Sequence, residues 1–497
     1  MKKFWRENWE IIVLLAVAAM ARLLFLGLRP FDGDEGVVIK IAQAANLKAL
    51  FEAVANDVHP PLYHFLEFLS LKILPFNEFN SRLVSALAGI FSIWLIYLVF
   101  KKITREKIAF AVALLSIFSA TLGYHAAEVR PYALFTLIFF WQFYLFLKII
   151  ERRNLYLSFY FCALTFALIL TQYLGFIVLF GEGIYLLIGQ REKIKSLWLA
   201  FVAPVFLFAF VWGGQFYHQF AGRMAEQSQT LNLKANIIGL INALYRFGAG
   251  RLFLDLDLSP AKNIAFLKSN SLMFTIFVFS VLVPLVLLTF GILHSIRSKD
   301  KNLTLILCLI VPFILAALVS SEIGPRAVRY FSFIVPFYLY FIFKLLFDKK
   351  IWPKILFAAF LCLYLASFVN QIYFERTKPG VNKIAEYLRG HGEKGDTVVI
   401  RGGYGGGEEL IAKYYLGERT KDISVIDIYG DYKVGNLKKL KARDPLEGIR
   451  DFKKIDQRVW FYDFTYEFDP ARATDLNPEK IYLGRDKENK EIVLYKF

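Results

Sequence analysis

The sequence predicts an α-helical polytopic membrane protein with a small C-terminal α/β domain outside the membrane. Hydrophobic residues make up 57% of the 497 residues, which exceeds the roughly 50% of soluble globular domains. They fall into blocks close to the length of about 20 that a helix needs to cross a bilayer. A helix also satisfies its own backbone hydrogen bonds in lipid. We expect about eleven spans, at 11–28, 80–100, 108–123, 131–150, 155–170, 173–189, 197–214, 271–293, 303–320, 329–347 and 352–372.

The charge pattern predicts the orientation of these spans. Most of the +17 net charge lies in short loops, and every second loop is basic. The positive-inside rule places such loops in the cytoplasm, so we expect a plasma-membrane protein with a cytoplasmic N-terminus and an extracytoplasmic C-terminal domain. This location of the charge argues against nucleic acid as a partner. The basic loops hold Lys2, Lys3 and Arg6; Lys101, Lys102, Arg105 and Lys107; Lys148, Arg152 and Arg153; Arg191, Lys193 and Lys195; Arg297, Lys299 and Lys301; and Lys349, Lys350 and Lys354.

The spans define a membrane domain, residues 1–375, and an extracytoplasmic α/β domain, residues 376–497. The first apolar block lacks a small-residue cleavage site, so we expect it to remain as an anchor. The C-terminal domain alternates helical stretches with the β-rich runs Asp396–Ile400, Ile423–Ile428, Arg458–Phe464 and Ile492–Phe497. Four further regions are expected to face outside, at 29–79, 124–130, 215–270 and 321–328.

The outer region 29–79 contains two amphipathic segments that predict interfacial helices. Apolar residues recur at helical spacing in both. They are Leu47, Leu50, Phe51 and Val54 in the first segment, and Leu62, Phe65, Leu66, Leu69 and Ile73 in the second, which follows Pro60-Pro61.

Two acidic residues follow the first span directly. Ionisable groups at a membrane face usually have a partner or a function, and Asp34 and Glu35 sit in the run Phe31–Gly36. A carboxylate at this place could act as a general base on a hydroxyl acceptor. Asp34 could equally be an ordinary helix N-cap, because Asp is a preferred capping residue.

His59, Glu128 and Arg130 are the next candidates. His59 stands before Pro60-Pro61, which fix the entry into a helix and leave its first N–H groups open. It could bind an anion there, or it could be a surface histidine. Glu128 and Arg130 could belong to a site, or they could form a weak solvated ion pair.

Arg326 and Arg329 also admit two interpretations. They could clamp a phosphate at the interface, because the arginine fork suits phosphate oxygens. They could equally extend toward lipid headgroups. The acids and histidines of the outer loops could in principle bind a divalent ion, but their spacing is not diagnostic of a metal site.

The glycine-rich run 402–407 lies between a predicted strand and a predicted helix. A dinucleotide-binding loop needs the spacing Gly-x-Gly-x-x-Gly, which cannot be laid on this run. We therefore expect an ordinary strand-to-helix loop.

Taken together, three motifs resemble the bacterial membrane glycosyltransferases of the glycosyltransferase-C fold. They are the Asp34-Glu35 pair, His59-Pro60-Pro61-Leu62-Tyr63 and Glu128-Val129-Arg130-Pro131-Tyr132. More narrowly, the chain resembles the branch related to protein O-mannosyltransferases and the lipid A aminoarabinose transferase. Arg329-Tyr330, at the start of a late span, is similar to that family's Arg-Tyr motif. Thr171-Gln172-Tyr173 departs from the family, in which many members read Thr-His-Tyr.

The resemblance implies transfer of a sugar from a polyprenyl-phosphate donor to an acceptor at the outer face. The acceptor could be a lipid, a glycan or a protein, and membrane lipids surround the enzyme. Asp34 would be the general base, with Glu35 and Glu128 as further catalytic acids. His59, Arg130, Arg326 and Arg329 would bind the donor phosphate. Further candidates for lining the pocket are Tyr63, Tyr124, His125, Tyr132, Gln172, Tyr173 and Tyr330.

Two other functions are compatible with a polytopic chain. A lipid or solute transporter would place ionisable groups near the bilayer midplane and often shows repeated halves. Here the polar candidates gather in the outer loops and no repeat is evident. A non-catalytic scaffold for the outer domain would leave these acidic and basic groups without a purpose.

Overall fold

In the computed structural model the chain forms two compact units. The helical unit comprises Met1–Leu24, Phe51–Leu66 and Arg82–Tyr373. The α/β unit comprises Phe25–Leu50, Glu67–Ser81 and Phe374–Phe497. The structure describes residues 2–496 except 153, 227–231, 251–270, 321–322, 325, 348–350, 375–380, 402–406, 428–431, 435–436, 440–457, 464–478 and 486–490. Parts of the predicted outer regions 215–270 and 321–328, and most of the glycine-rich run, therefore lie outside the described residues.

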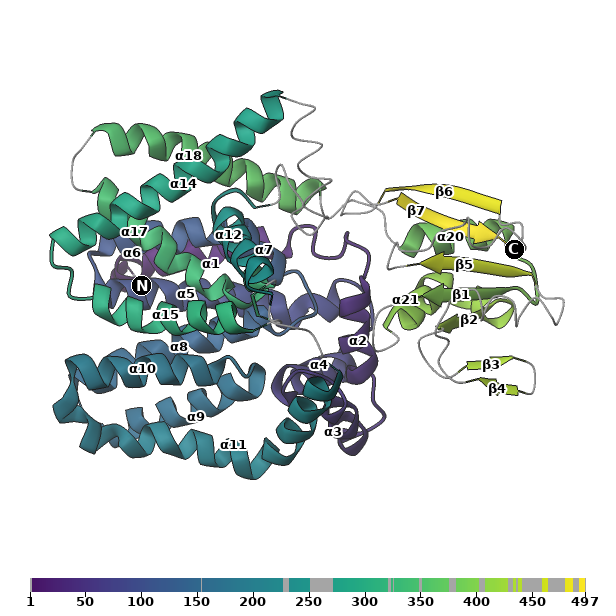
Figure 1. Cartoon of the computed structure of the whole chain (residues 1–497), viewed down its shortest axis with the longest axis horizontal. Helices are drawn as coiled ribbons and strands as arrows, with labels where there is room; N and C mark the ends of the chain where they lie inside the picture. The colour runs from purple at the N-terminus through teal and green to yellow at the C-terminus, as the bar shows by residue number, and fades with distance from the viewer. Residues whose placement is uncertain are drawn as a thin grey trace. The chain divides into compact units, whose positions relative to one another are not determined.

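The helical unit consists of long apolar helices with shorter ones packed among them (Figure 1). The longer helices are α1 (Lys2–Leu23), α5 (Leu83–Ile103), α8 (Tyr132–Glu151), α11 (Arg191–Glu226), α14 (Ser271–Arg297) and α18 (Ile351–Val369). The shorter ones are α6 (Glu106–Ile117), α7 (Ala120–His125), α9 (Leu155–Thr171), α10 (Gly175–Gly189), α12 (Leu233–Ala249), α15 (Leu303–Val319), α16 (Ala327–Tyr330) and α17 (Val335–Leu346). Single turns lie at η1 (Asn80–Arg82), η2 (Ser332–Ile334) and η3 (Asn370–Phe374).

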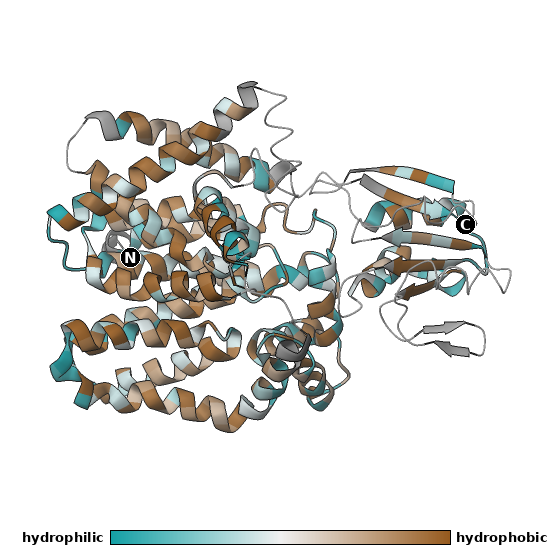
Figure 2. Cartoon of the chain, in the orientation of Figure 1, coloured by the Kyte–Doolittle hydropathy of each residue, from teal (hydrophilic) through white to brown (hydrophobic). Residues whose placement is uncertain are grey.

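The apolar character of these helices agrees with a membrane protein. Hydrophobic residues cover most of their length (Figure 2), and Phe210 on α11 is 91% exposed. Large exposed apolar surfaces are typical of contact with lipid or a partner. Five described stretches are long and apolar enough to cross a membrane: Asn80–Ile103, Tyr132–Glu151, Arg191–Ala221, Val278–Arg297 and Lys354–Ile372. The total of about eleven spans stays a prediction.

Three predicted spans end early or are broken in the structure. The span 11–28 ends early, because α1 stops at Leu23 and Phe25 adopts a φ of 62°. The span 108–123 is broken after Ile117, where the Ser119 side chain caps α7 by accepting a hydrogen bond from the Leu122 N–H at 3.2 Å. The span 329–347 is divided into α16, η2 and α17. Pro336 lies in the first turn of α17, where its missing N–H is tolerated.

Beyond the predicted span 197–214, α11 continues to Glu226. The predicted outer region 215–270 thus contains the end of one helix and all of α12. The mixed polar and aromatic residues after 214 do not end α11, because helix propensity differs little among most of them.

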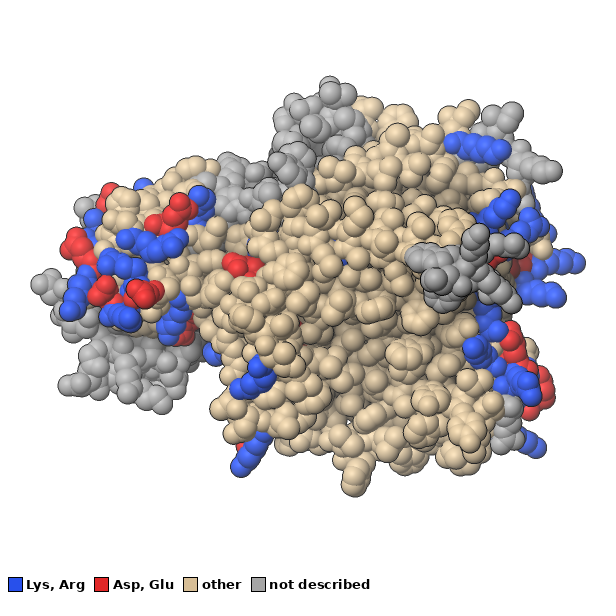
Figure 3. Space-filling model, turned by 180° about the vertical axis from the view of Figure 1, so that it is seen from behind, with Lys and Arg blue, Asp and Glu red and all other residues tan. Residues whose placement is uncertain are grey.

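The basic loops of the helical unit meet at one end. Lys102 forms an ion pair with Glu151 at 2.5 Å, and the Asn302 side chain donates to the Ile103 carbonyl at 2.7 Å. Lys193 donates to the carbonyl of Ile150. Figure 3 shows Lys and Arg side chains gathered at this end, while few charged side chains are visible on the rest of this face of the helical unit. The geometry is that expected of loops lying on one side of a membrane.

The α/β unit contains a five-stranded sheet in the order β2-β1-β5-β7-β6. β1 (Thr397–Arg401) pairs in parallel with β2 (Ser424–Asp427) and β5 (Val459–Asp463). β7 (Glu491–Lys496) runs antiparallel to β5 and β6 (Glu479–Arg485). A separate hairpin joins β3 (Tyr432–Val434) and β4 (Leu437–Lys439). The helices of the tail are α20 (Val381–His391), α21 (Gly407–Leu416) and the single turn η4 (Gly417–Lys421).

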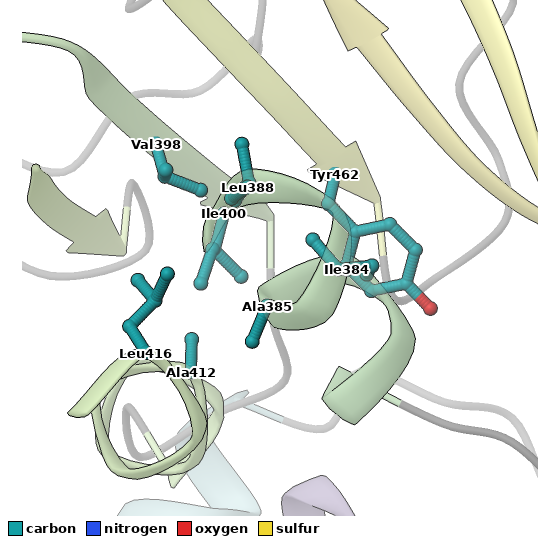
Figure 4. A pocket seen from close by; sticks show the side chains of 8 residues that line it. All are labelled: Ile384, Ala385, Leu388, Val398, Ile400, Ala412, Leu416 and Tyr462. Carbon is teal, nitrogen blue, oxygen red and sulfur yellow. The ribbon is translucent and has the colours of Figure 1, made fainter. Parts of the chain in front are cut away.

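The core of the sheet packs against α20 and α21. Figure 4 shows Ile384, Ala385 and Leu388 of α20 facing Val398 and Ile400 of β1, with Ala412, Leu416 and Tyr462 completing the cluster. The space between them is about 10 Å³, which holds about one water at most. It is a packing gap in an apolar core and not a ligand site.

Segments from the first outer region also belong to the α/β unit. Helix α2 (Gly33–Ala42) crosses the start of α21, with the two backbones in close contact. A Cβ on Gly36 would lie 2.4 Å from the Gly407 carbonyl oxygen, so only glycine fits this crossing. The Phe31 N–H also donates to the Tyr415 hydroxyl at 2.8 Å. Gly407, the last glycine of the run 402–407, therefore allows α2 and α21 to pack closely.

The predicted amphipathic segments form helices α3 (Leu47–Ala55) and α4 (Pro61–Ile73). Their inward side chains include Leu50 and Val54, both fully buried. Pro61 opens α4, as the proline preference for the first helical turn predicts.

Candidate active site

The candidate residues are divided between the two units. Asp34 and Glu35 belong to the α/β unit, and the other candidates belong to the helical unit. Each group is therefore described within its own unit.

Asp32 rather than Asp34 caps helix α2. The Asp32 carboxylate accepts a hydrogen bond from the Glu35 N–H at 3.0 Å, and Glu35 accepts one from the Asp32 N–H at 3.2 Å. This reciprocal pair is a capping box. The capping interpretation of Asp34 is thus wrong. Asp34 lies in the first turn with a half-buried side chain, where the helix dipole stabilises a carboxylate.

Glu35 is fully buried and bound on two sides. Its second oxygen pairs with the Arg29 guanidinium at 2.8 Å, and Arg29 also lies 3.8 Å from Asp32. These contacts fix the turn that carries Asp34. Removing one partner of a buried ion pair costs about 3–5 kcal/mol, so we expect Glu35 to matter for the stability of this turn.

Glu67 of α4 is an unpredicted member of the same group. Its side chain is fully buried, and neither carboxylate oxygen has a hydrogen-bond partner among the described residues. Burial, and then the charge of Glu35, raise the pKa of Glu67 well above its ordinary value. Glu67 therefore holds its proton at pH values at which an exposed glutamate has released it.

In the helical unit, His59 is held by a carboxylate that none of the sequence motifs indicated. Asp57 accepts hydrogen bonds from the His59 backbone N–H at 3.2 Å and from its ring Nδ1 at 3.1 Å. The ring tautomer with hydrogen on Nδ1 leaves Nε2 available to a ligand. Burial alone would raise the pKa of Asp57, but the His59 hydrogen bond and the charges of His59 and His64 hold it well below its usual range.

His64 lies on the other side of Asp57, with its Nε2 3.4 Å from the same oxygen. Its side chain is fully buried, and burial lowers the pKa of His64 to about 4. The imidazole is therefore neutral at physiological pH, although Asp57 opposes this shift. The charge of Arg130 also lowers the pKa of His64, so His64 lies within electrostatic range of the second outer loop.

The second outer loop is buried, so the solvated interpretation of Glu128 and Arg130 is wrong. Glu128 is 1% and Arg130 is 7% exposed. The Glu128 carboxylate lies 3.1 Å from Nδ1 of His125. This is a second carboxylate–histidine pair, built like that of Asp57 and His59. Tyr124 packs edge-on against His125, with ring centroids 5.5 Å apart.

Tyr132 joins this loop to the late Arg-Tyr motif. Its ring lies 4.8 Å from that of His125 and 6.1 Å from that of Tyr330. Arg130, Arg329 and Glu128 all lie within electrostatic range of its hydroxyl. The structure thus brings together residues 125–132 and 329–330, which are about 200 positions apart. Arg326, at the N-cap of α16, is exposed.

Tyr63 and Gln172-Tyr173 have different surroundings. The Tyr63 hydroxyl bonds to Ser85 at 2.8 Å, and Ser85 donates to the Arg130 carbonyl at 3.2 Å. Tyr63 is fully buried, so it supports the backbone of the second loop. Gln172 ends α9 and is buried. Tyr173 donates to Gln219 and accepts from the Trp212 indole at 3.0 Å, which places it against α11.

The sequence contained only weak signals for Asp57, His64 and Glu67. Asp57 stands two residues before His59, in the turn between α3 and α4. His64 and Glu67 stand five and eight residues after it on α4, an interfacial helix whose polar side chains would normally face water. Only burial distinguishes them. Among the described residues, no group of three or more His, Cys, Asp or Glu side chains is arranged to hold a metal ion.

Comparisons with known proteins agree with this architecture. Residues 58–213 match the family model described as dolichyl-phosphate-mannose-protein mannosyltransferase. The oligosaccharyltransferase of Archaeoglobus fulgidus in its apo form superposes with a TM-score of 0.53 at 12% identity, covering 92% of this chain and 70% of that chain. The chain has a glycosyltransferase-C fold. The predicted resemblance to this group of membrane glycosyltransferases is thereby confirmed.

Two further structures with the glycosyltransferase-C fold are similar. The archaeal enzyme AglB of Archaeoglobus fulgidus, in complex with an inhibitory peptide and a dolichol-phosphate, has a TM-score of 0.53 at 11% identity over 92% of this chain and 70% of that chain. ArnT from Cupriavidus metallidurans, bound to undecaprenyl phosphate, has a TM-score of 0.49 at 12% identity over 98% of both chains. No curated protein matches the sequence significantly. The matched segment 58–213 includes His59, Glu128 and Arg130 and leaves out Asp34 and Arg329.

Proposed function

We propose that this protein is a membrane glycosyltransferase that moves a sugar from a polyprenyl-phosphate donor to an acceptor hydroxyl at the extracytoplasmic face. The observation that carries the proposal is the buried group of Glu128, Arg130 and Tyr132 with Arg329 in the helical unit. Most of it lies in the segment that matches the mannosyltransferase family. Buried ionisable groups at one end of a membrane helix bundle mark a functional site.

The arginines and His59 suit a phosphate leaving group. When the bond between the anomeric carbon and the phosphate oxygen breaks, negative charge develops on the phosphate. Preorganised cations and N–H donors lower the energy of that state. Arg130 and Arg329 would supply this charge, and Arg326 would bind the phosphate nearer the solvent. Asp57 orients His59 so that Nε2 can contact the phosphate.

Asp34 is proposed as the general base. It would accept the proton of the acceptor hydroxyl while the hydroxyl oxygen attacks the anomeric carbon and polyprenyl phosphate leaves. A single displacement of this kind inverts the anomeric configuration. Glu35, which is ion-paired to Arg29, would hold the Asp34 turn, and Glu128 would orient His125. The acceptor is a lipid, a glycan or a protein, and a divalent metal is a candidate cofactor.

The test compares two neighbouring carboxylates. The purified protein is incubated with a panel of polyprenyl-phosphate sugars, and release of polyprenyl phosphate is measured. Asp34→Asn should lower turnover by about 10²–10⁴-fold while donor binding persists. Asp32→Asn is the matched control, because Asn caps helices as well as Asp, and it should stay close to wild type. Turnover unchanged in Asp34→Asn would remove Asp34 from the base role. Failure of every donor in the wild type would remove the transferase proposal.

A further inference from the structure

A cavity of about 510 Å³ opens at the basic end of the helical unit. It lies where the ends of α5, α6, α14 and α17 meet, and it is separate from all the candidate catalytic residues. Ligand pockets commonly have volumes of about 300–1,000 Å³. The cavity is therefore large enough for the headgroup of a lipid or a comparable small molecule.

The lining of this cavity carries a surplus of positive charge. Lys102, Arg105 and Lys344 line it together with one carboxylate, that of Asp300. Asp300 is already neutralised, since it pairs with Lys344 and accepts a hydrogen bond from the Tyr340 hydroxyl at 2.5 Å. Burial alone would raise the pKa of Asp300, but these contacts lower it, so the carboxylate is ionised and bound. Arg105 can therefore meet an external anion, and Lys102, which is paired with Glu151, adds a second cation to the same lining.

Lys102 and Arg105 lie close to the cavity mouth. Arg105 is exposed at the N-cap of α6, and its side chain makes no cap hydrogen bond. Lys102 is half-buried and also reaches Glu151 at 2.5 Å. Thr104, between them, contributes a hydroxyl to the lining. Two cations and a hydroxyl around one opening form a suitable arrangement for phosphate oxygens.

Part of the cavity wall is apolar. Ile103, Ile108 and Phe347 line it, and Phe347 is itself 41% exposed. On α14, Ile296 is 54% exposed beside this end. A soluble anion gains no binding energy from apolar side chains, whereas an amphiphile contacts both the charged and the apolar residues of the lining. The combination favours a lipid over free phosphate.

We propose that this cavity binds the headgroup phosphate of an anionic phospholipid, with Lys102 and Arg105 contacting the phosphate and the apolar wall contacting the glycerol esters. Basic pockets between membrane helices on the cytoplasmic side bind anionic headgroups in this way. The charge pattern predicts that this end faces the cytoplasm, where the leaflet is rich in anionic lipid. The site does not depend on the proposed transferase activity.

Native mass spectrometry of the full-length purified protein tests the proposal. The protein is titrated separately with phosphatidylglycerol, phosphatidylcholine and inorganic phosphate. The wild type should retain phosphatidylglycerol in preference to the other two. Lys102→Gln combined with Arg105→Gln should weaken that binding by roughly fivefold for each cation removed. Lys107→Gln is the matched control, because Lys107 is exposed on the same turn and does not line the cavity.

Three results would overturn the proposal. They are equal retention of the zwitterionic lipid, unchanged phosphatidylglycerol binding in the double variant, and inorganic phosphate binding as tightly as the lipid. The last result would define a site for small soluble anions. If the double variant does not fold, Arg105→Gln alone gives the test, with an expected loss of roughly fivefold. Arg105 is exposed, so its replacement leaves the packing intact.

Discussion

Replacing Glu67 with glutamine should change how the stability of the protein depends on pH. In the folded state burial, and secondarily the charge of Glu35, raise the pKa of Glu67 above its ordinary value of 4.5. In the unfolded state the same carboxyl titrates near 4.5. Between these two values the folded protein keeps a proton that the unfolded protein has released. The stability contributed by protonated Glu67 is therefore fully present below pH 4.5 and is lost as the pH rises through the folded-state pKa.

The magnitude follows from proton linkage. One proton bound only in the folded state makes the free energy of unfolding fall by about 1.4 kcal/mol per pH unit. Glutamine has nearly the same shape and does not titrate, so the Glu67→Gln variant lacks this slope. The difference in stability between variant and wild type should be constant below pH 4.5 and grow with that slope above it. Two pH units above 4.5, the variant should have gained up to about 2.7 kcal/mol on wild type.

Thermal unfolding of the purified protein, followed by fluorescence of its eight tryptophans from pH 4.5 into the mildly alkaline range, measures this difference. Glu52→Gln serves as the control, because Glu52 is an exposed carboxylate on the neighbouring helix α3. Its pH profile should run parallel to that of wild type. Parallel profiles for Glu67→Gln and wild type would refute the reasoning, since they would mean that Glu67 is solvated or paired in the folded protein.

Two further predictions concern the other groups. Asp57→Asn removes the charge that orients His59. A hydrogen bond to a charged group is worth about 1.5–3 kcal/mol, so its loss should weaken donor binding about 10- to 100-fold. An unchanged KM for the donor would show that His59 does not need this carboxylate. Gly407→Ala would place a Cβ 2.4 Å from the Val37 backbone nitrogen and should destabilise the protein by about 1–3 kcal/mol, seen as a lower unfolding midpoint. Gly390→Ala is the control, because Gly390 lies on an open face of α20 with no described atom within 4 Å of the added Cβ. This variant should be neutral or more stable than wild type. Equal destabilisation by Gly407→Ala and Gly390→Ala would contradict the close crossing of α2 and α21.

Local sequence signals predicted most helices well. The apolar blocks at 131–150, 155–170 and 303–320 correspond to α8, α9 and α15 within one or two residues. Burial in lipid or in the helical core requires uninterrupted apolar side chains, which can be recognised from sequence alone. The breaks near Ser119 and Ser332 were not predicted, because a single polar residue in an apolar run is not a strong stop signal.

In the C-terminal α/β domain, too, some strands were predicted from the sequence and others were not. Runs of β-branched and aromatic residues predicted β1, β2, β5 and β7, but β6 (Glu479–Arg485) was missed. This strand lies at the edge of the sheet and carries an irregularity between Tyr482 and Gly484. An edge strand buries less of its surface, so its alternation of apolar and polar residues is weaker.

The sequence by itself determined the membrane class, the helices and the motifs that relate this chain to glycosyltransferases. These depend on composition and on residues close together along the chain. Only the tertiary structure decided that Asp57 holds His59, that Glu67 is buried with no hydrogen-bond partner among the residues described, and that Gly36 meets Gly407. Desolvation and close packing depend on which distant segments surround a side chain, and neither spacing nor residue type contains that information.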